Sequence, residues 1–250
     1  MVSPYYSIEH WSTANAMPDY KNNDPVEITV NDRAATRQAI INAVRRSRTE
    51  FVERSSWAAH KAKTASMQDD WDYRGIAVHH AGRSFTCGPA ALQLQDIQSM
   101  QMDPTLLQRM QGKMHADDIG YHYAIDCFGN IYEGRDIRFK GEHLFRYNTG
   151  IIGIVLLENL AEPEERKDLA GRMQSLVRLL GKNGPQIPDR QKDSLRKLVE
   201  ILSNVFYIWV LGGHREFQNQ SAGEGRICPG NVGLEFVKTL RASLRLSSPS

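Results

Sequence analysis

The sequence has little charge imbalance, no long hydrophobic run and few cysteines. Its 31 basic and 29 acidic residues give a formal net charge of +2, so no strong positive field favours a nucleic-acid partner. No apolar run approaches the roughly 20 residues that a membrane-spanning helix needs, so no membrane span is expected. Three cysteines in 250 residues are too few for a disulfide framework. These absences are typical of an ordinary globular protein.

The first 21 residues lack the features of a secretory signal. They contain no basic stretch followed by a continuous apolar segment, so we expect synthesis in the cytoplasm without such a signal. Hydrophobic residues make up 41% of the chain, which is enough for a well-formed core. The length predicts one sizeable domain with an extension, or two small domains.

Residues 1–50 are expected to form an N-terminal extension. They begin with a polar, turn-rich stretch and a short strand-like segment at 26–30. A helix follows, which Asn31 or Asp32 can cap, and we expect its apolar stripe to pack on the main domain. That stripe consists of Ile40, Ile41 and Val44.

Residues 51–250 are expected to form an α/β (α+β) domain with a central mixed sheet flanked by helices. Short β-branched runs alternate there with amphipathic segments whose apolar residues recur every three or four positions. The stretch 127–130 predicts a hairpin turn in which Gly129 can adopt a positive φ. The expected strands are 76–80, 121–126, 130–133, 151–157 and 207–211, and the expected helices are 91–102, 169–180, 195–202 and 236–244.

Three separate motifs contain residues that commonly bind zinc. They are His79 in Val-His-His, His214 in Gly-His-Arg-Glu and Cys228 in Arg-Ile-Cys-Pro-Gly. A catalytic zinc site uses three protein ligands and leaves the fourth position for water, whose pKa the metal lowers to about 7. Because the three residues come from distant parts of the chain, they argue against a finger-type structural site, in which paired ligands lie close in sequence.

Five motifs in register resemble the zinc-dependent N-acetylmuramoyl-L-alanine amidases of the type 2 group, which share a fold with peptidoglycan recognition proteins (PGRPs). The resemblance covers roughly residues 51–245 and implies that His79, His214 and Cys228 bind Zn²⁺. It also implies that Tyr121 is catalytic, and a phenol beside the metal can orient water and donate to an oxyanion. The motifs lie at 52–57, 76–80, 118–126 with 129–135, 147–154, and 213–216 with 228–230.

Arg226 is the second candidate catalytic residue. It occupies a position near the metal where relatives carry lysine or threonine. Arginine stays protonated, so it can stabilise an oxyanion but is a poor general acid or base. The interval between His214 and Cys228 is longer than is usual in the family, and its polar stretch 218–225 is expected to form a flexible loop that leaves the placement of Arg226 open.

Four further residues near these motifs are candidates for binding or support. His143 and Asn148 match positions near the substrate groove of relatives, which implies substrate binding, with hydrogen bonding inside their loop as the alternative. His80 and His122 follow His79 and Tyr121 directly, and adjacent side chains of a strand point to opposite faces. We therefore expect structural roles for His80 and His122.

Two other residues leave alternatives open. Cys87 lies where animal recognition proteins often have one half of a disulfide, but the expected nearby partner is missing. Cys87 is interpreted as a free thiol, and pairing with Cys127 is the less favoured alternative. Glu216 either supports the metal ligands or forms a surface salt bridge with Arg215 or Arg226.

The resemblance implies an enzyme that hydrolyses the amide between N-acetylmuramic acid and L-alanine in peptidoglycan. The alternatives are a non-catalytic peptidoglycan-binding module and a zinc peptidase that cuts within the stem peptide. Retention of all three ligands and the tyrosine favours the amidase. We further expect a monomer that acts on the cell wall after export or release, as a lytic or exported antibacterial enzyme, with the extension serving delivery or binding an inhibitor partner.

Overall fold

Six strands form one mixed sheet in the residues that the computed structural model describes, 33–82, 87–103, 116–165, 184–220 and 227–250. The strand order is β1-β4-β3-β5-β2-β6. Strands β3 and β4 are antiparallel, whereas all the other neighbours are parallel. The strands are β1 (Phe51–Val52), β2 (Gly75–His80), β3 (Tyr123–Ile125), β4 (Ile131–Glu133), β5 (Ile151–Leu156) and β6 (Val210–Gly213).

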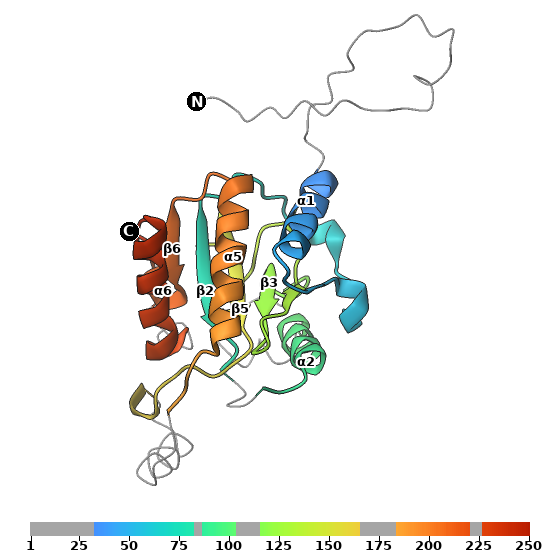
Figure 1. Cartoon of the computed structure of the whole chain (residues 1–250). Coiled ribbons are helices and arrows are strands. Elements are labelled where there is room, and N and C mark those ends of the chain that lie inside the picture. The colour runs from blue at the N-terminus through green and yellow to red at the C-terminus, as the bar shows by residue number, and fades with distance from the viewer. Residues whose placement is uncertain (1–32, 83–86, 104–115, 166–183, 221–226) are drawn as a thin grey trace, which may run out of the picture.

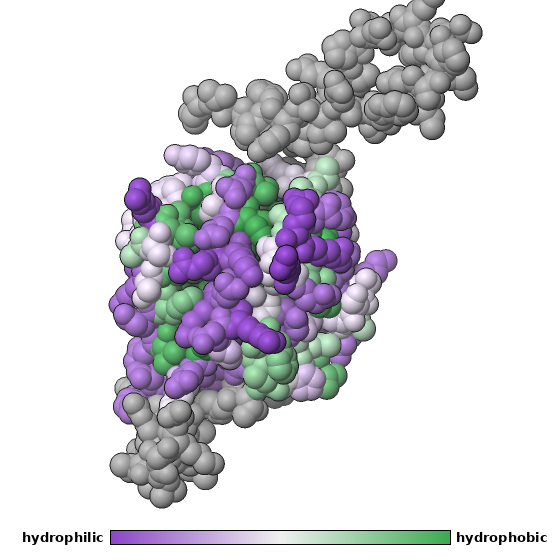
Figure 2. Space-filling view, in the orientation of Figure 1, coloured by the Kyte–Doolittle hydropathy of each residue, from purple (hydrophilic) through white to green (hydrophobic). Residues whose placement is uncertain are grey.

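Helices cover both faces of this sheet (Figure 1). Helices α1, α5 and α6 share one hydrophobic core with one face of the sheet, whereas α2 belongs to a separate cluster on the other face. Hydrophilic side chains cover the outer surfaces of α1 and α5 (Figure 2). No helix in the described part of the chain combines the length and apolarity that a membrane span requires. The helices are α1 (Arg33–Arg46), α2 (Ala90–Met102), α5 (Asp189–Val205) and α6 (Gly230–Leu244).

The alternation of side chains along β2 determines which face carries the candidate ligand. Ile76 and Val78 belong to the core under α1, α5 and α6. Ala77 lies on the opposite face, and His79 follows it by two residues along the strand. Because side chains two positions apart point to the same side, His79 faces away from the large helical core.

The predicted architecture is confirmed, with differences at strand ends. The expected helices 91–102, 195–202 and 236–244 correspond to α2, α5 and α6. Gly129 has a φ of 86° in the turn between β3 and β4, as expected. The last strand begins at Val210 rather than at 207. The expected strand at 26–30, the cap at 31–32 and the helix at 169–180 lie outside the described residues.

Helix α1 packs against the main domain, as expected from its apolar stripe. Ile40, Ile41 and Val44 are each at most 1% exposed and belong to the same cluster as the apolar face of α5. Arg37, on the same helix, bonds through Nη2 to the Glu133 carboxylate at 2.6 Å and to Glu53 at 3.1 Å. These contacts fasten α1 to the β1–β4 edge of the sheet.

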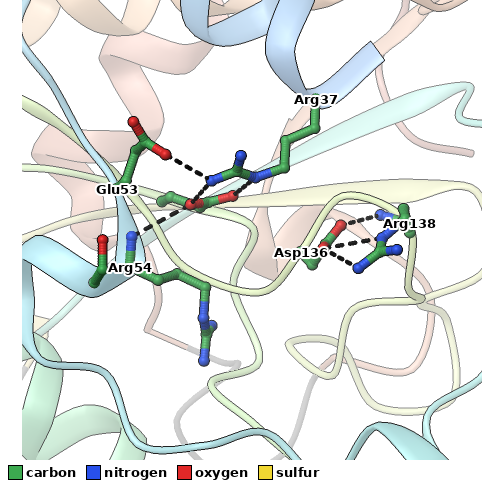
Figure 3. A pocket seen from close by; sticks show the side chains of 7 residues that line it. Arg37, Glu53, Arg54, Asp136 and Arg138 are labelled. Carbon is green, nitrogen blue, oxygen red and sulfur yellow. Dashed lines mark hydrogen bonds and ion pairs between the residues drawn. The ribbon is translucent and has the colours of Figure 1, made fainter. Parts of the chain in front are cut away.

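A charged pocket of about 440 Å³ lies where α1 meets this edge (Figure 3). Figure 3 shows Arg37 extending from α1 toward Glu53, with the Asp136–Arg138 ion pair on the other side of the pocket. The arginines and carboxylates that line it are joined in ion pairs, so their charges are largely satisfied within the protein. The lining residues are Arg37, Glu53, Arg54, Ser55, Glu133, Asp136 and Arg138.

The interpretation of Cys87 as a free thiol is wrong. Cys87 and Cys127 form a disulfide, with their Cα atoms 5.6 Å apart and 40 positions apart in the sequence. The bond joins the segment between β2 and α2 to the turn between β3 and β4. This pairing was the less favoured alternative because it needs a contact that only the folded sheet creates.

Candidate metal centre

The three predicted ligands meet at the carboxyl ends of strands β2 and β6. Strands β2 and β6 are parallel neighbours, and Val78 on β2 pairs with Gly213 on β6. The next residues along the two strands, His79 and His214, therefore lie side by side, with ring centroids 4.5 Å apart. Cys228 approaches from the segment before α6, and its Sγ lies 3.7 Å from His79 Nδ1. One ligand atom from each of the three residues lies within 4.8 Å of the others.

A chain of hydrogen bonds determines which nitrogen of His79 carries the proton. His143 Nε2 lies 3.2 Å from the carbonyl oxygen of Ile151, which can only accept, so this nitrogen is the donor. In a neutral imidazole the other nitrogen is then an acceptor, and His143 Nδ1 lies 3.0 Å from His79 Nε2. His79 Nε2 must therefore donate. His79 Nδ1 is left with its lone pair facing Cys228 Sγ.

His214 is held in the same way by Gln220. The Gln220 amide donates through Nε2 to the carbonyl oxygens of Phe145 and Gln218, at 3.0 and 2.6 Å, and its Oε1 accepts from the Phe145 N–H at 2.9 Å. These bonds orient the amide, so His214 Nε2, which lies 3.0 Å from Oε1, must donate to it. Nδ1 is then the His214 nitrogen that can bind a metal.

Cys228 lies in a buried position that suits a thiolate. Its side chain is 6% exposed, and the backbone N–H of His80 donates to Sγ at 3.4 Å, which stabilises negative charge on sulfur. The carbonyl oxygen of Cys228 accepts from the Arg215 N–H at 3.0 Å, which ties this segment to the turn that carries His214. The sulfur is thus positioned from both neighbouring segments.

Electrostatics keep the buried histidines neutral. Burial, followed by the nearby His214, holds the pKa of His79 well below its usual value. Burial also lowers the pKa of His143, with His122 as the next cause. Neutral imidazole is the form that binds a metal or accepts a hydrogen bond. The protonation states required by the hydrogen-bond chain therefore agree with the environment.

The donor set fits a zinc ion. Two imidazole nitrogens and one thiolate sulfur are the ligand types that zinc prefers, and three protein ligands leave one tetrahedral position for water or substrate. The second nitrogen of each histidine is bonded to a protein acceptor, as is typical of metal-ligating histidines. We therefore treat His79, His214 and Cys228 as a candidate zinc centre.

Tyr121 lies directly beside this centre. Its ring centroid is 4.9 Å from that of His79 and 6.2 Å from that of His143. Its side chain is partly exposed, so the ring is in reach of both the ligands and solvent. The structure thus brings the predicted catalytic tyrosine to the predicted ligands. Arg226 lies outside the described residues.

The two candidate substrate-binding residues lie in one loop but have different neighbours. Asn148 Oδ1 accepts from the N–H groups of His143 and Leu144, and its Nδ2 donates to the Leu144 carbonyl oxygen, which closes the loop. The His143 ring packs against Gly153 of β5, where an added Cβ would lie 2.4 Å from the ring. Both side chains therefore have structural contacts, and their binding of substrate stays a prediction.

His80 and His122 have structural contacts, as expected, although Tyr121 and His122 precede β3 and are not in a strand, unlike the expected strand 121–126. His122 is fully buried, and its Nδ1 accepts from the Gly153 N–H at 3.0 Å while its Nε2 lies 2.9 Å from the Phe139 carbonyl oxygen. Burial lowers the pKa of His122 to about 4. His80 Nδ1 accepts from the Leu160 N–H at 3.0 Å.

Glu216 does not form the salt bridge with Arg215 that the sequence offered, and the other considered partner, Arg226, lies outside the described residues. Its carboxylate pairs with Arg241 of α6 at 3.0 Å and accepts from the Gly213 N–H at 2.8 Å. Arg215 pairs instead with Glu165 at 2.9 Å. Glu216 thereby ties the turn that carries His214 to α6.

Comparison with known families identifies the relationship. A family model described as N-acetylmuramoyl-L-alanine amidase (Amidase_2) matches residues 67–231, a stretch that contains all three candidate ligands and Tyr121. The chain belongs to this type 2 amidase family. The resemblance inferred from the five motifs is thereby confirmed.

One curated relative shows how much of this amidase-family chain is shared. This chain is 30% identical to peptidoglycan-recognition protein SC2 of Drosophila melanogaster over 110 residues. These residues make up 44% of this chain and 55% of that protein. The chain therefore spans about half the length of this relative.

Two solved structures support the fold. The endolysin N-acetylmuramoyl-L-alanine amidase LysCS from Clostridium intestinale has a TM-score of 0.51 and 20% identity, over 79% of this chain and 97% of that one. Peptidoglycan recognition protein-LE in complex with tracheal cytotoxin has a TM-score of 0.55 and 19% identity, over 76% and 92%. At these identities the likeness concerns the fold, which matches the predicted mixed sheet with flanking helices.

The residue that orients His214 was not predicted from the sequence. Gln220 is 3% exposed, although it lies in a stretch that was expected to be a flexible loop. The stretch contains two glutamines, Gln218 and Gln220, and no pattern in the sequence distinguishes Gln220 from its neighbours. Only the fold places it between His214 and Phe145.

Proposed function

We propose that this chain is a zinc-dependent N-acetylmuramoyl-L-alanine amidase that cleaves the amide between N-acetylmuramic acid and L-alanine. The observation that carries the proposal is the arrangement of His79, His214 and Cys228. Both imidazoles have Nε2 committed to a protein acceptor, and the thiol lies against the nitrogen that remains on His79. A recognition module that only binds peptidoglycan does not require this arrangement.

Zinc bound by these three residues would supply a Lewis acid that lowers the pKa of water to about 7 and polarises the scissile carbonyl. His143 and Gln220 keep a proton on Nε2 of His79 and His214, so each ring stays fixed while the amide reacts. Cys228 keeps its charge beside the His80 N–H. These residues provide a rigid support whose geometry does not depend on the substrate.

Tyr121 is proposed to act on the developing oxyanion. Its ring stands beside His79 and is partly exposed, so its hydroxyl can face a substrate carbonyl at the centre. A hydrogen bond that forms only as the carbonyl oxygen becomes negative stabilises the transition state more than the ground state. Arg226 is proposed to add positive charge to the same site.

The proposed substrate class is the muropeptide of peptidoglycan. The solved relative PGRP-LE is bound to tracheal cytotoxin, a monomeric diaminopimelic acid-type peptidoglycan. The family description, N-acetylmuramoyl-L-alanine amidase, names the bond. Both support the proposal that the stem peptide and muramic acid of such a compound enter beside Tyr121.

Adjacent histidines provide a matched test. His79→Gln removes the proposed ligand, whereas His80→Gln changes the next residue and keeps an acceptor for the Leu160 N–H. We expect His79→Gln to lose stoichiometric zinc and to reduce the release of dye-labelled peptidoglycan by at least about 100-fold, while His80→Gln keeps both within a few-fold. Metal analysis and the dye-release rate are the measurements. Full hydrolysis by zinc-free His79→Gln protein would refute the proposal.

A further inference from the structure

A second group of metal-ligating side chains lies apart from the proposed catalytic centre. It consists of Cys87, Cys127 and Glu158, whose sulfur and carboxylate oxygen atoms lie within 4.8 Å of one another. The three residues come from the segment after β2, the turn after β3 and the segment after β5. The two sulfurs are joined as a disulfide in this structure.

Glu158 gives this group a feature that a structural disulfide does not need. The residue is 5% exposed, and its Oε1 has no hydrogen-bond partner among the described residues. A buried carboxylate oxygen without a partner is costly, and burial, with a smaller effect of Asp126, raises the pKa of Glu158 to about 7. A cation at this position would supply the missing partner.

Asp126 directly precedes Cys127 in the sequence, but its role differs from that of Glu158. Its Oδ1 accepts from the N–H groups of Phe128 and Asn130, and its Oδ2 accepts from the Asn130 amide and the Tyr132 hydroxyl. All of these bonds hold the β3–β4 turn. Glu158 is therefore the carboxylate that faces the sulfurs and is left to bind a ligand.

The two cysteines differ in exposure in a way that suits thiol–disulfide exchange. Cys87 is exposed, whereas Cys127 is 5% exposed. A small thiol can reach the sulfur of Cys87, and a metal ion can enter from the same side. The Cα separation of 5.6 Å keeps both sulfurs close enough to share one metal ion after reduction.

We propose that Cys87, Cys127 and Glu158 form a second metal site when the Cys87–Cys127 disulfide is reduced. This site binds a thiophilic divalent cation such as Zn²⁺ or Cd²⁺. A dithiol supplies two electrons and two protons to the disulfide and becomes a disulfide itself. The cation then displaces the two thiol protons and binds both thiolates and the carboxylate, with water as the fourth ligand. The disulfide and the metal complex exclude each other, because the same two sulfurs form both.

The first test compares metal stoichiometry in the oxidised and reduced full-length protein. A phosphine reductant opens the disulfide and is removed under anaerobic conditions before dialysis against Cd²⁺. We expect one more bound Cd²⁺ per chain in the reduced protein than in the oxidised protein. Equal stoichiometry in the two forms would overturn the proposal, and no hydrolysis assay enters this result.

The second test assigns the additional ion to its ligands. In a Cys228→Ala background, reduced protein should show the ultraviolet thiolate-to-cadmium absorption of two Cd–S bonds, which Cys127→Ser should remove. Glu158→Gln should weaken binding by at least about tenfold, whereas Glu200→Gln, on the exposed surface of α5, should not. Unchanged affinity in folded Glu158→Gln protein would exclude the carboxylate. If that variant does not fold, the stoichiometry of the unaltered chain still decides whether the site exists.

Discussion

Two hydrogen bonds decide, at the scale of single residues, which nitrogen of each candidate ligand can face a metal. His143 accepts a hydrogen bond from His79 Nε2–H, and Gln220 accepts one from His214 Nε2–H. Neither residue was assigned this role from the sequence. The motifs around His79, His214 and Cys228 were sufficient to predict the candidate ligands. The supporting residues were not predictable, because their role depends on the direction of a hydrogen bond and not on residue type.

The support by His143 can be tested with two substitutions of different chemistry. His143→Phe fills similar space but has no acceptor for His79 Nε2–H, whereas His143→Asn keeps an oxygen near the position of Nδ1. We expect His143→Phe to weaken zinc binding by about 10- to 100-fold and His143→Asn to weaken it less. Competition with a chelating dye measures the affinity. Equal affinities in wild type and His143→Phe would show that this hydrogen bond does not position the ligand.

The cysteine pair shows another limit at the residue scale. Pairing of Cys87 with Cys127 was not favoured from the sequence, in which the two residues lie 40 positions apart. Their approach requires the turn after β3 and the segment after β2 to meet at the sheet. Glu158 joins them only because β5 lies between β3 and β2 in the strand order.

At the scale of elements, the neighbouring ends of β2 and β6 bring the candidate ligands His79 and His214 together. The sequence predicted His79 at the end of one strand and His214 just after another, because β-branched and apolar residues precede both. It did not predict that β2 and β6 are neighbours, since strand order depends on pairing between distant segments. The parallel register then places His79 beside His214 without further requirements.

Helix α1 allows a matched test of how the predicted extension is fastened. Arg37 pairs with Glu133, whose side chain is 4% exposed, whereas Arg45 on the same helix pairs with the more exposed Glu53. Arg37→Ala leaves a buried carboxylate without its main partner, and we expect a loss of about 2 to 3 kcal/mol in the free energy of unfolding.

Arg45→Ala is the control for this prediction, because an exposed pair contributes less than about 1 kcal/mol. Urea unfolding measures both variants. Equal losses for Arg37→Ala and Arg45→Ala would mean that the buried pair does not fasten α1.

At the scale of the whole molecule, the large hydrophobic core and the candidate metal centre lie on opposite faces of the sheet. Helices α1, α5 and α6 cover one face of the sheet, and His79 points to the other. The large core can therefore stabilise the fold without contributing side chains to the site. The mixed sheet with flanking helices was predictable from periodicity and motif order.

The identity of the cleaved bond tests the central claim most directly. Purified sacculi are incubated with zinc-loaded protein and, in parallel, with the Cys228→Ala variant, and the soluble products are analysed by mass spectrometry. The account predicts intact stem peptides with a free L-alanine amine and peptide-free glycan, both absent from the control. Products cut within the stem peptide, or sacculi that retain the protein without any release, would contradict it.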